Sequence, residues 1–294
     1  MDDQLCLMTV HAHPDDEASK GPGSVAKAHD EGISTVLVCC TGGEEGDLQN
    51  PSLREAGQPL HGLTPEEEKA RLVEMRPLEL ARSAEIIGFD EVVMLGYRDS
   101  GMPETEANAR PEAFANAPLD EAVGRLVAII RKARPQVIIT YGDDQRGYPH
   151  PDHLKVHDIS IVAFDRAGDP DWYPEHGEPY QPRKLYYSAW SMRRMKAVHE
   201  KMLEMGLESP FDQKWFDRPS QEDRITTQVD ISSWSSVRRL ALLAHATQVD
   251  PTSKFWFGLP DDVSDGLHTH EDYIRARSLV DADLPETDLF AGIR

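Results

Sequence analysis

Apolar residues in this chain alternate between short runs and longer amphipathic stretches. The short apolar runs have the length of buried strands, and they lie at residues 5–8, 33–40, 91–95 and 136–141. Strands without polar alternation are typical of a parallel sheet that helices cover on both faces. The pattern therefore predicts an α/β fold with a Rossmann-like, open, mostly parallel sheet and helices on both faces.

Helix start and stop signals separate these apolar runs. The clearest set bounds residues 64–87. Thr64 is placed as the N-cap, Glu67 completes a capping box, and Gly88 ends the helix. Pro77 is expected to kink this helix, because proline removes a backbone donor. Further helices are expected at residues 24–31, 119–133 and 151–166.

Past residue 167 the pattern becomes less regular. Residues 168–183 are rich in proline, glycine and aromatic residues, so we expect a long loop that walls a pocket. Strands are expected at 184–190 and 226–230, and helices at 192–205 and 232–248, with His245 in the last turn. We expect a single domain over residues 1–294, with the sheet core in 1–166 and the pocket wall in 167–294.

The chain is strongly acidic. A formal charge of −21 at pH 7 makes nucleic acid or an anionic membrane surface an unfavourable partner. No apolar run approaches the length of a membrane span, and residues 1–4 lack the basic region and apolar core of a signal peptide. Cys6, Cys39 and Cys40 give no even disulfide framework and are expected to be small buried hydrophobes. We therefore expect a cytoplasmic protein with a small-molecule substrate, and the composition is compatible with a homo-oligomer.

Two stretches rich in histidine and aspartate follow predicted strands. Residues 10–17 read VHAHPDDE after the first strand, and residues 148–153 read YPHPDH after the fourth. Because parallel strands place their carboxyl ends at one edge of a sheet, we expect the two stretches to meet there. Imidazole and carboxylate ligands suit a borderline divalent metal such as zinc, and Fe²⁺ is compatible with the same donors.

We interpret His13, Asp16 and His153 as the metal ligands, which leaves an open position for water. Pro14 fixes its own φ and restricts the residue before it, so the first strand must end in a turn. Asp15 and Asp16 then point in different directions, so that Asp15 is free to act as an unligated general base. The alternative is an ordinary turn with a helix N-cap, because aspartate is favoured in both places. The second stretch argues against that alternative.

These residues resemble the LmbE-like zinc hydrolases, the superfamily of N-acetylglucosaminyl-phosphatidylinositol de-N-acetylase. Residues 11–17 and 150–153 match its two motifs without a gap. Further similar stretches lie at 76–79, 99–102, 244–248 and 284–292, so the resemblance covers nearly the whole chain. It implies an LmbE-like fold and a metal-dependent hydrolase that acts on a C–N amide bond.

Within this superfamily the chain looks most similar to the amidases of mycothiol S-conjugates, through Ser19, Lys20 and Gly21 and through the tail. The resemblance implies a zinc amidase of detoxification that releases an N-acetylcysteine (mercapturate) conjugate and glucosaminyl-inositol. It leaves open deacetylation of N-acetylglucosaminyl-inositol in the synthesis of the same thiol, or a related reaction in a secondary-metabolite pathway. A nucleotide-binding module with structural histidines is a further alternative, but the chain lacks a G-x-G-x-x-G pattern.

The resemblance also implies roles for individual residues. It gives the same metal ligands and the same base as the reasoning from the motifs. His150, held by Asp152, would stabilise the oxyanion or protonate the leaving amine, and Tyr148 would polarise the carbonyl. Substrate-binding residues that the resemblance implies are Lys20, Arg76 and Met102, with Arg76 toward the sugar–inositol part.

Overall fold

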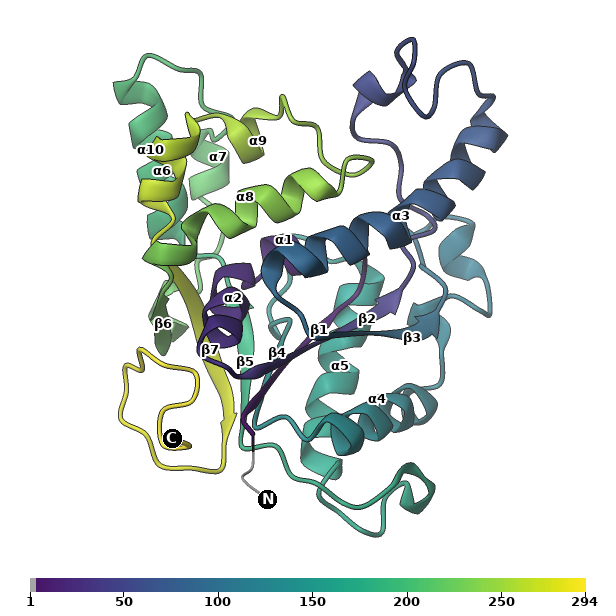
Figure 1. The fold of residues 1–294 in the computed structure, drawn as a ribbon, viewed down its shortest axis with the longest axis vertical. Coiled ribbons are helices and arrows are strands. Elements are labelled where there is room, and N and C mark those ends of the chain that lie inside the picture. The colour runs from purple at the N-terminus through teal and green to yellow at the C-terminus, as the bar shows by residue number, and fades with distance from the viewer. Residues whose placement is uncertain (1–3) are drawn as a thin grey trace.

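A seven-stranded sheet runs through the middle of the molecule (Figure 1). The structure, a computed structural model, describes residues 4–294; residues 1–3, part of the stretch assessed for a signal peptide, lie outside the described residues. The strand order is β3-β2-β1-β4-β5-β7-β6, in which the first five run parallel and the last two pair antiparallel. The strands are β1 (Cys6–His11), β2 (Ser34–Thr41), β3 (Glu91–Tyr97), β4 (Val137–Thr140), β5 (Lys184–Ala189), β6 (Thr227–Asp230) and β7 (His270–Ser278).

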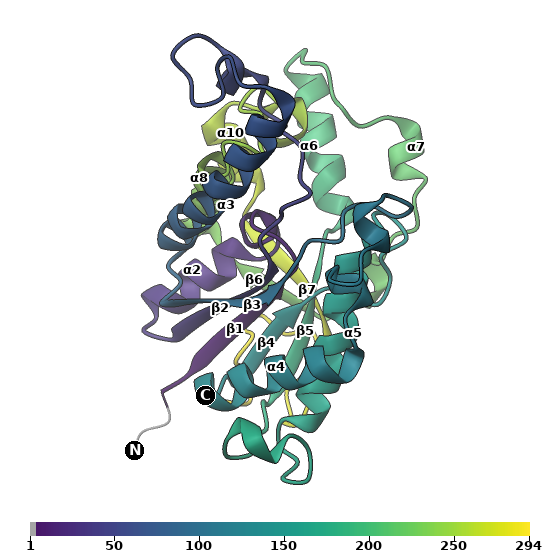
Figure 2. The same ribbon diagram turned by 90° about the vertical axis from the view of Figure 1, so that its right-hand side faces the viewer.

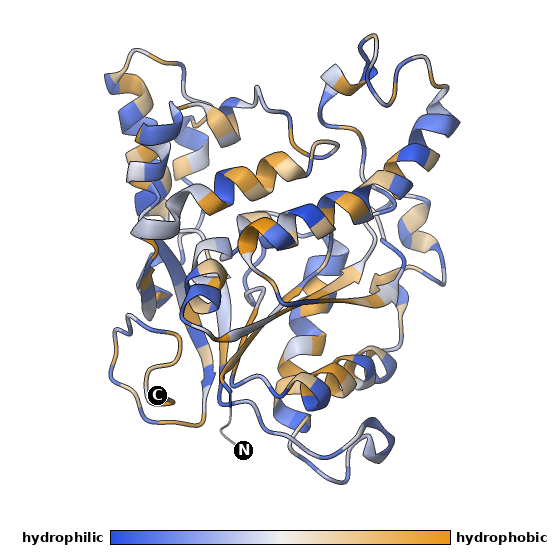
Figure 3. Cartoon of the chain, in the orientation of Figure 1, coloured by the Kyte–Doolittle hydropathy of each residue, from blue (hydrophilic) through white to orange (hydrophobic). Residues whose placement is uncertain are grey.

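Helices cover both faces of the sheet, as the apolar pattern predicts (Figure 2). Met8 and Val10 of β1 pack with the two helices of one face, α4 and α5, whereas Leu7 packs with α2 and α8 on the other. Figure 3 shows hydrophobic residues along the central strands and on the covering helices. The helices are α1 (Asp16–Ser19), α2 (Pro22–Asp30), α3 (Pro65–Ile87), α4 (Leu119–Ala133), α5 (Pro151–Arg166), α6 (Met192–Glu204), α7 (Gln213–Phe216), α8 (Ser235–Ala244), α9 (Lys254–Phe257) and α10 (Asp261–Leu267).

Local signals in the first half of the chain predicted the elements well. The expected bounds of α4 and α5 are confirmed, and α3 begins with the predicted capping box between Thr64 and Glu67 and ends at Gly88. This helix continues unbroken across Pro77. The three cysteine side chains are buried free thiols in β1 and β2, as expected. No helix of residues 4–294 is long and apolar enough to cross a membrane.

The last third of the chain differs from the prediction in several elements, among them the short helices α7, α9 and α10, which were not predicted. The nine-residue strand β7 was not predicted, because its sequence HEDYIRARS has neither an apolar run nor a clean alternation. The helix expected over 232–248 ends at Ala244, so His245 lies just beyond α8. Side chains explain the early end: His245 contacts Glu17 in α1, and Thr247 donates to Glu79 in α3 at 2.6 Å.

The expectation that residues 168–183 wall a pocket is wrong. None of them is among the described residues that line the cavity at the carboxyl edge of the sheet. Arg131 of α4 holds this loop elsewhere, donating to backbone carbonyls that include those of Asp169 and Trp172 at 2.9 and 2.7 Å. The loop precedes β5 and therefore lies at the opposite edge of the parallel strands.

The strand order creates a natural site between β1 and β4. These two strands are neighbours, and the chain leaves β1 toward β2 on one side but leaves β4 toward β5 on the other. Open α/β sheets bind ligands in the crevice at such a switch point, beyond the carboxyl ends of the strands. The two histidine- and aspartate-rich stretches follow β1 and β4 at this point.

Candidate metal centre and active site

Three buried side chains from the two stretches converge beyond the ends of β1 and β4. One donor atom from each of His13, Asp16 and His153 lies within 4.8 Å of the other two. Asp16 Oδ2 is 3.4 Å from His13 Nδ1 and 3.4 Å from His153 Nε2. The structure thus brings together the predicted ligands, although about half of the chain separates His153 from the other two.

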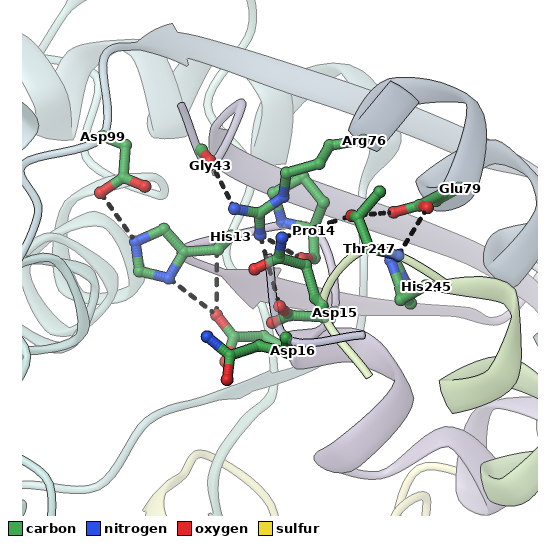
Figure 4. Close-up of polar contacts among 12 residues, drawn as sticks. His13, Pro14, Asp15, Asp16, Gly43, Arg76, Glu79, Asp99, His245 and Thr247 are labelled. Carbon is green, nitrogen blue, oxygen red and sulfur yellow. Dashed lines mark hydrogen bonds and ion pairs between the residues drawn. The ribbon is translucent and has the colours of Figure 1, made fainter. Parts of the chain in front are cut away.

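The turn after β1 sends the two adjacent aspartates in different directions (Figure 4). Asp15 has a φ of +117°, a left-handed value that is unfavourable for a residue with a side chain. Its backbone N–H donates to Glu17 Oε2 at 2.9 Å, which holds this strained conformation. Asp16 then begins α1 and faces the histidines, whereas the Asp15 carboxylate faces Arg76.

A carboxylate orients the His13 ring. His13 Nε2 lies 3.1 Å from Asp152 Oδ2, and Asp152 is itself fixed by the backbone N–H of Ser100 at 2.9 Å and by the Ser100 hydroxyl. When Nε2–H donates to a carboxylate, Nδ1 keeps a free lone pair on the side of Asp16. This is the carboxylate–histidine arrangement that commonly supports a metal ligand.

A second group of donors shares His13 and adds Asp99, His150 and Asp152. In this second group both carboxylate oxygens of Asp152 are already engaged, because Oδ2 accepts from the Ser100 N–H and Oδ1 from the Ser100 hydroxyl. Asp16 Oδ2 of the first group also accepts a backbone hydrogen bond, from the His13 N–H at 3.0 Å, but it is the one atom that both imidazoles approach, each at 3.4 Å. The geometry therefore favours the first group as the metal ligands.

The charges around these residues suit a cation. Burial lowers the pKa of His153 to about 4, so its imidazole is neutral at pH 7, the form that binds metals. Burial would also lower the pKa of His13, but hydrogen bonds to Asp152, Asp16 and Asp99 raise it well above its ordinary value. Carboxylates outnumber the cationic side chains around His13, and a divalent ion would balance them. The residues present thus fit a metal ion.

Asp15 is placed and charged as a base would be. Its side chain is 30% exposed, and it lines the cavity. Burial raises the pKa of Asp15 to about 6, against the opposing effect of Arg76, whose Nη2 is 3.3 Å from Oδ2. The carboxylate is ionised at pH 7 yet more basic than an ordinary aspartate.

Arg76 of α3 lies behind Asp15, with only 3% of its surface exposed. Its guanidinium donates to the Pro14 carbonyl at 2.7 Å and to the Gly43 carbonyl, and it pairs with Asp15. A Cβ atom at Gly43 or Gly46 would overlap the guanidinium, so these glycines make room for it. The observed contacts are those of a residue that positions Asp15, and the predicted contact with substrate stays a prediction.

His150 is the N-cap of α5, and its Nδ1 accepts from the Asp152 backbone N–H at 3.2 Å. The neutral ring must then carry its proton on Nε2. Burial, followed by the effect of His13, lowers the pKa of His150, which favours this neutral donor form. Asp152 contacts His150 through its backbone N–H, whereas its carboxylate binds His13 and Ser100.

The remaining predicted residues border the cavity. Tyr148 is 56% exposed, and its hydroxyl lies 3.9 Å from the sulfur of Met102, another exposed side chain. Lys20 contacts the Asp16 carboxylate and lies 5.3 Å from the centre of the Tyr141 ring. Roles of these residues in binding or polarising a substrate remain predictions.

Several residues of the site were not predicted. Glu17 receives the Asp15 N–H, the Ser83 hydroxyl and His245 Nε2, the last at 2.5 Å. Tyr141 stacks on His153 with ring centres 4.4 Å apart. Asp99, Glu17 and His245 lie in stretches that the family resemblance includes, so each could have been singled out. The contact between Glu17 and His245, more than 200 residues apart, has no signal in one sequence.

A large cavity opens beside these groups. Its volume is about 1040 Å³, at the upper end of the range for small-molecule sites. The lining includes Asp15, Lys20 and His150 as well as residues from loop 45–49 and from the last third of the chain. The cavity is large enough for a substrate that extends well beyond one sugar.

The chain is similar to known proteins over its full length. The family described as GlcNAc-PI de-N-acetylase matches residues 8–164. Mycothiol S-conjugate amidase from Streptomyces coelicolor is 44% identical, with 100% of this chain and 99% of that protein covered. The 1D-myo-inositol 2-acetamido-2-deoxy-alpha-D-glucopyranoside deacetylase from Streptomyces avermitilis is 38% identical, with 98% and 97% covered. N,N'-diacetylchitobiose deacetylase from Pyrococcus horikoshii has the same fold, with a TM-score of 0.60 at 18% identity over 93% of this chain and 84% of that one.

Proposed function

Because the chain belongs to the GlcNAc-PI de-N-acetylase family, we propose that it is a metal-dependent amidase of mycothiol S-conjugates. Hydrolysis of the amide would release an N-acetylcysteine S-conjugate and glucosaminyl-inositol. One observation carries this choice: over the whole chain, identity to the amidase from Streptomyces coelicolor exceeds identity to the deacetylase from Streptomyces avermitilis. The large cavity, which has room for an acyl group bigger than acetyl, supports it.

His13, Asp16 and His153 would hold the metal ion. Two imidazoles and one carboxylate suit zinc, and the same donors accept Fe²⁺. When bound, such an ion supplies Lewis acidity, because it polarises the scissile carbonyl and acidifies water. Three protein ligands leave room for a substrate atom.

Asp15 removes a proton from the attacking water. Its carboxylate faces the cavity, is ionised at neutral pH, and is kept in place by Arg76. A base whose pKa lies near the working pH combines the correct protonation state with a sufficient driving force for proton transfer. The protonated Asp15 then returns this proton to the amine nitrogen, because the C–N bond breaks only when the nitrogen leaves as a neutral amine rather than as an anion.

His150 and Tyr148 stabilise the negative charge that develops on the carbonyl oxygen. His150 offers its Nε2–H, because burial favours the neutral ring and the Asp152 N–H occupies Nδ1. The Tyr148 hydroxyl is protonated at neutral pH and can donate. Removing one such donor costs about 3 kcal/mol of transition-state stabilisation in other hydrolases.

The proposed function is tested by comparing the rates of hydrolysis of two substrates. The zinc-loaded protein is incubated with a mycothiol S-conjugate and, separately, with N-acetylglucosaminyl-inositol, and the freed amine is quantified. We expect kcat/KM to be at least roughly tenfold higher for the S-conjugate, a difference of ~1.4 kcal/mol in transition-state binding.

The deacetylase is the second candidate, supported by 38% identity across nearly the whole chain. Higher kcat/KM for release of acetate would favour it and reject the amidase. If the metal-loaded protein hydrolysed neither compound, both proposals would be wrong.

A further inference from the structure

Part of the cavity wall is built from large aromatic side chains. Trp190, Trp215, Phe255 and Trp256 all line the cavity, and together they are called the aromatic wall below. They come from three separate segments: the end of β5, the short helix α7 and the short helix α9. The sequence gives no periodic pattern that would group them, and only the fold brings them together.

The rings of the aromatic wall support one another. Phe255 stacks on Trp190 with ring centres 6.1 Å apart, and Trp256 meets Phe255 edge-on at 4.7 Å. The guanidinium of Arg238 lies 5.0 Å from the centre of the Trp256 ring and 5.9 Å from that of Trp190. Held rings lose little conformational freedom when a ligand binds, so the wall is preorganised.

Another part of the cavity wall is polar. Loop 45–49 contributes Glu45, Asp47 and Gln49, and hydrogen bonds tie this loop to residues 247–248. The Gln49 backbone N–H donates to the Thr247 carbonyl at 2.9 Å. This loop also reaches the metal centre, because the Glu45 N–H donates to Asp99 at 3.2 Å. The cavity therefore has an apolar lobe at the aromatic wall and a polar lobe at loop 45–49, and both adjoin the candidate active site.

The aromatic wall begins beside the predicted metal ligands. Trp190 directly follows β5, the strand that pairs with β4. Trp190 and Lys20 line both the large cavity and a small adjoining pocket, and Lys20 contacts the ligand Asp16. A group attached to the acyl side of a bound amide could thus lie against the rings while its carbonyl lies at the metal site.

We propose that the aromatic wall is a subsite for an aromatic substituent on the sulfur of the substrate. This inference rests on the proposed amidase function and adds to it the chemical class of the conjugated group. Ring–ring contacts contribute about 0.5–1.5 kcal/mol each beyond their buried area, so a conjugate with an aromatic ring gains more here than one with a methyl group. The sugar–inositol end would occupy the polar lobe.

The test compares S-benzyl-mycothiol with S-methyl-mycothiol on the zinc-loaded protein. For the wild type we expect kcat/KM to be about tenfold higher for the S-benzyl conjugate, mainly through a lower KM. Trp215→Ala should lower the ratio of the two kcat/KM values by several-fold, whereas Trp215→Phe, which keeps a ring, should retain most of it. Trp172→Ala is the matched control. Trp172 lies in the loop at 168–183, outside the cavity, and its ring stacks on Arg166 of α5.

Each outcome decides the proposal. An unchanged ratio in Trp215→Ala, or an equal fall of the ratio in Trp172→Ala, would overturn it. If the wild type hydrolysed neither conjugate, the amidase function would be refuted, and binding of S-benzyl-N-acetylcysteine measured by calorimetry would decide the subsite alone. The subsite stands if Trp215→Ala weakens that binding several-fold, and it falls if the affinity is unchanged.

Discussion

At the scale of single residues, Asp15 concentrates the chemistry of the site. This residue, at the edge of the cavity, combines a strained backbone with a φ of +117°, a contact with Arg76 and a pKa of about 6. Backbone strain of this kind costs of the order of 1–3 kcal/mol and persists only where the surroundings enforce it. Here Glu17 and Arg76 enforce it, which is consistent with a positioned base.

Asp15→Asn tests the role of the base. Asparagine tolerates a positive φ and keeps the shape of the side chain, so the turn should be retained. We expect kcat to fall by about 10²–10⁴-fold, the usual contribution of a general base, with metal stoichiometry unchanged. Steady-state kinetics and elemental analysis measure both quantities. The control is Asp158→Asn on the exposed side of α5, and full activity of the Asp15 variant would exclude it as the base.

The sequence predicted which residues meet, but it could not predict how their rings are oriented. His13, Asp16 and His153 were found from two local motifs and the rule that parallel strands share an edge. Asp152 was predicted to hold His150, and it contacts that ring through its backbone N–H, whereas the hydrogen bonds of its carboxylate to His13 and Ser100 were not predicted. Such choices depend on packing between segments, which one sequence does not record.

At the scale of elements, a buried ion pair connects α1 with the end of α8. Glu17 and His245 are both fully buried, and His245 Nε2 lies 2.5 Å from Glu17 Oε1. Burial lowers the pKa of His245, but Glu17 more than offsets this effect and raises it. Since Glu17 also accepts the Asp15 N–H, this pair couples the position of α8 to the conformation of the base.

His245→Ala should therefore affect both stability and catalysis. Removing one partner of a buried pair leaves an uncompensated charge and costs about 3–5 kcal/mol. We expect a loss of this size in the free energy of unfolding, measured by urea denaturation, and a lower kcat with little change in KM. His199→Ala, a histidine of α6 paired with Ser209, is the control. A fall in stability without any fall in kcat would show that the pair does not position Asp15.

Elements with strong local signals were predictable, and those defined by tertiary partners were not. The capping box and Gly88 gave the bounds of α3 directly, and the expected bounds of α4 are those observed. Strand β7 carries Glu271 and Asp272 in buried positions, and these acids accept hydrogen bonds from other segments, such as those from the Gly23 N–H and Gln228. Its charged sequence therefore gives no strand signal.

At the scale of the whole molecule, a buried carboxylate fastens the C-terminal segment to the sheet. Glu286 accepts from Lys184 of β5 at 2.5 Å, from Tyr186 at 2.7 Å and from Thr227 of β6 at 2.8 Å. Burial alone would raise the pKa of Glu286, but these hydrogen bonds outweigh it and hold the pKa below its ordinary value. Through Glu286, the C-terminal segment is attached to strands β5 and β6 of the central sheet.

This network predicts a pH-dependent stability. A carboxylate whose pKa is lower in the folded state stabilises the fold above its unfolded pKa, and the effect is lost as the pH falls through the folded pKa. The stability difference between wild type and Glu286→Gln should thus be largest at pH 7 and shrink below about pH 4.5. Urea denaturation at several pH values measures it, with the exposed Glu175→Gln as control. A difference that did not change with pH would contradict the assigned pKa shift.

The convergence of residues after β1 and β4 on one metal ion is best tested by anomalous X-ray diffraction from crystals of the zinc-loaded protein. Data collected on both sides of the zinc absorption edge locate the ion without reference to activity. We expect one anomalous peak at ~2 Å from donor atoms of His13, Asp16 and His153, the usual length of such bonds. A peak on the group of Asp99, His150 and Asp152, or no peak between His13 and His153, would contradict the proposed metal centre.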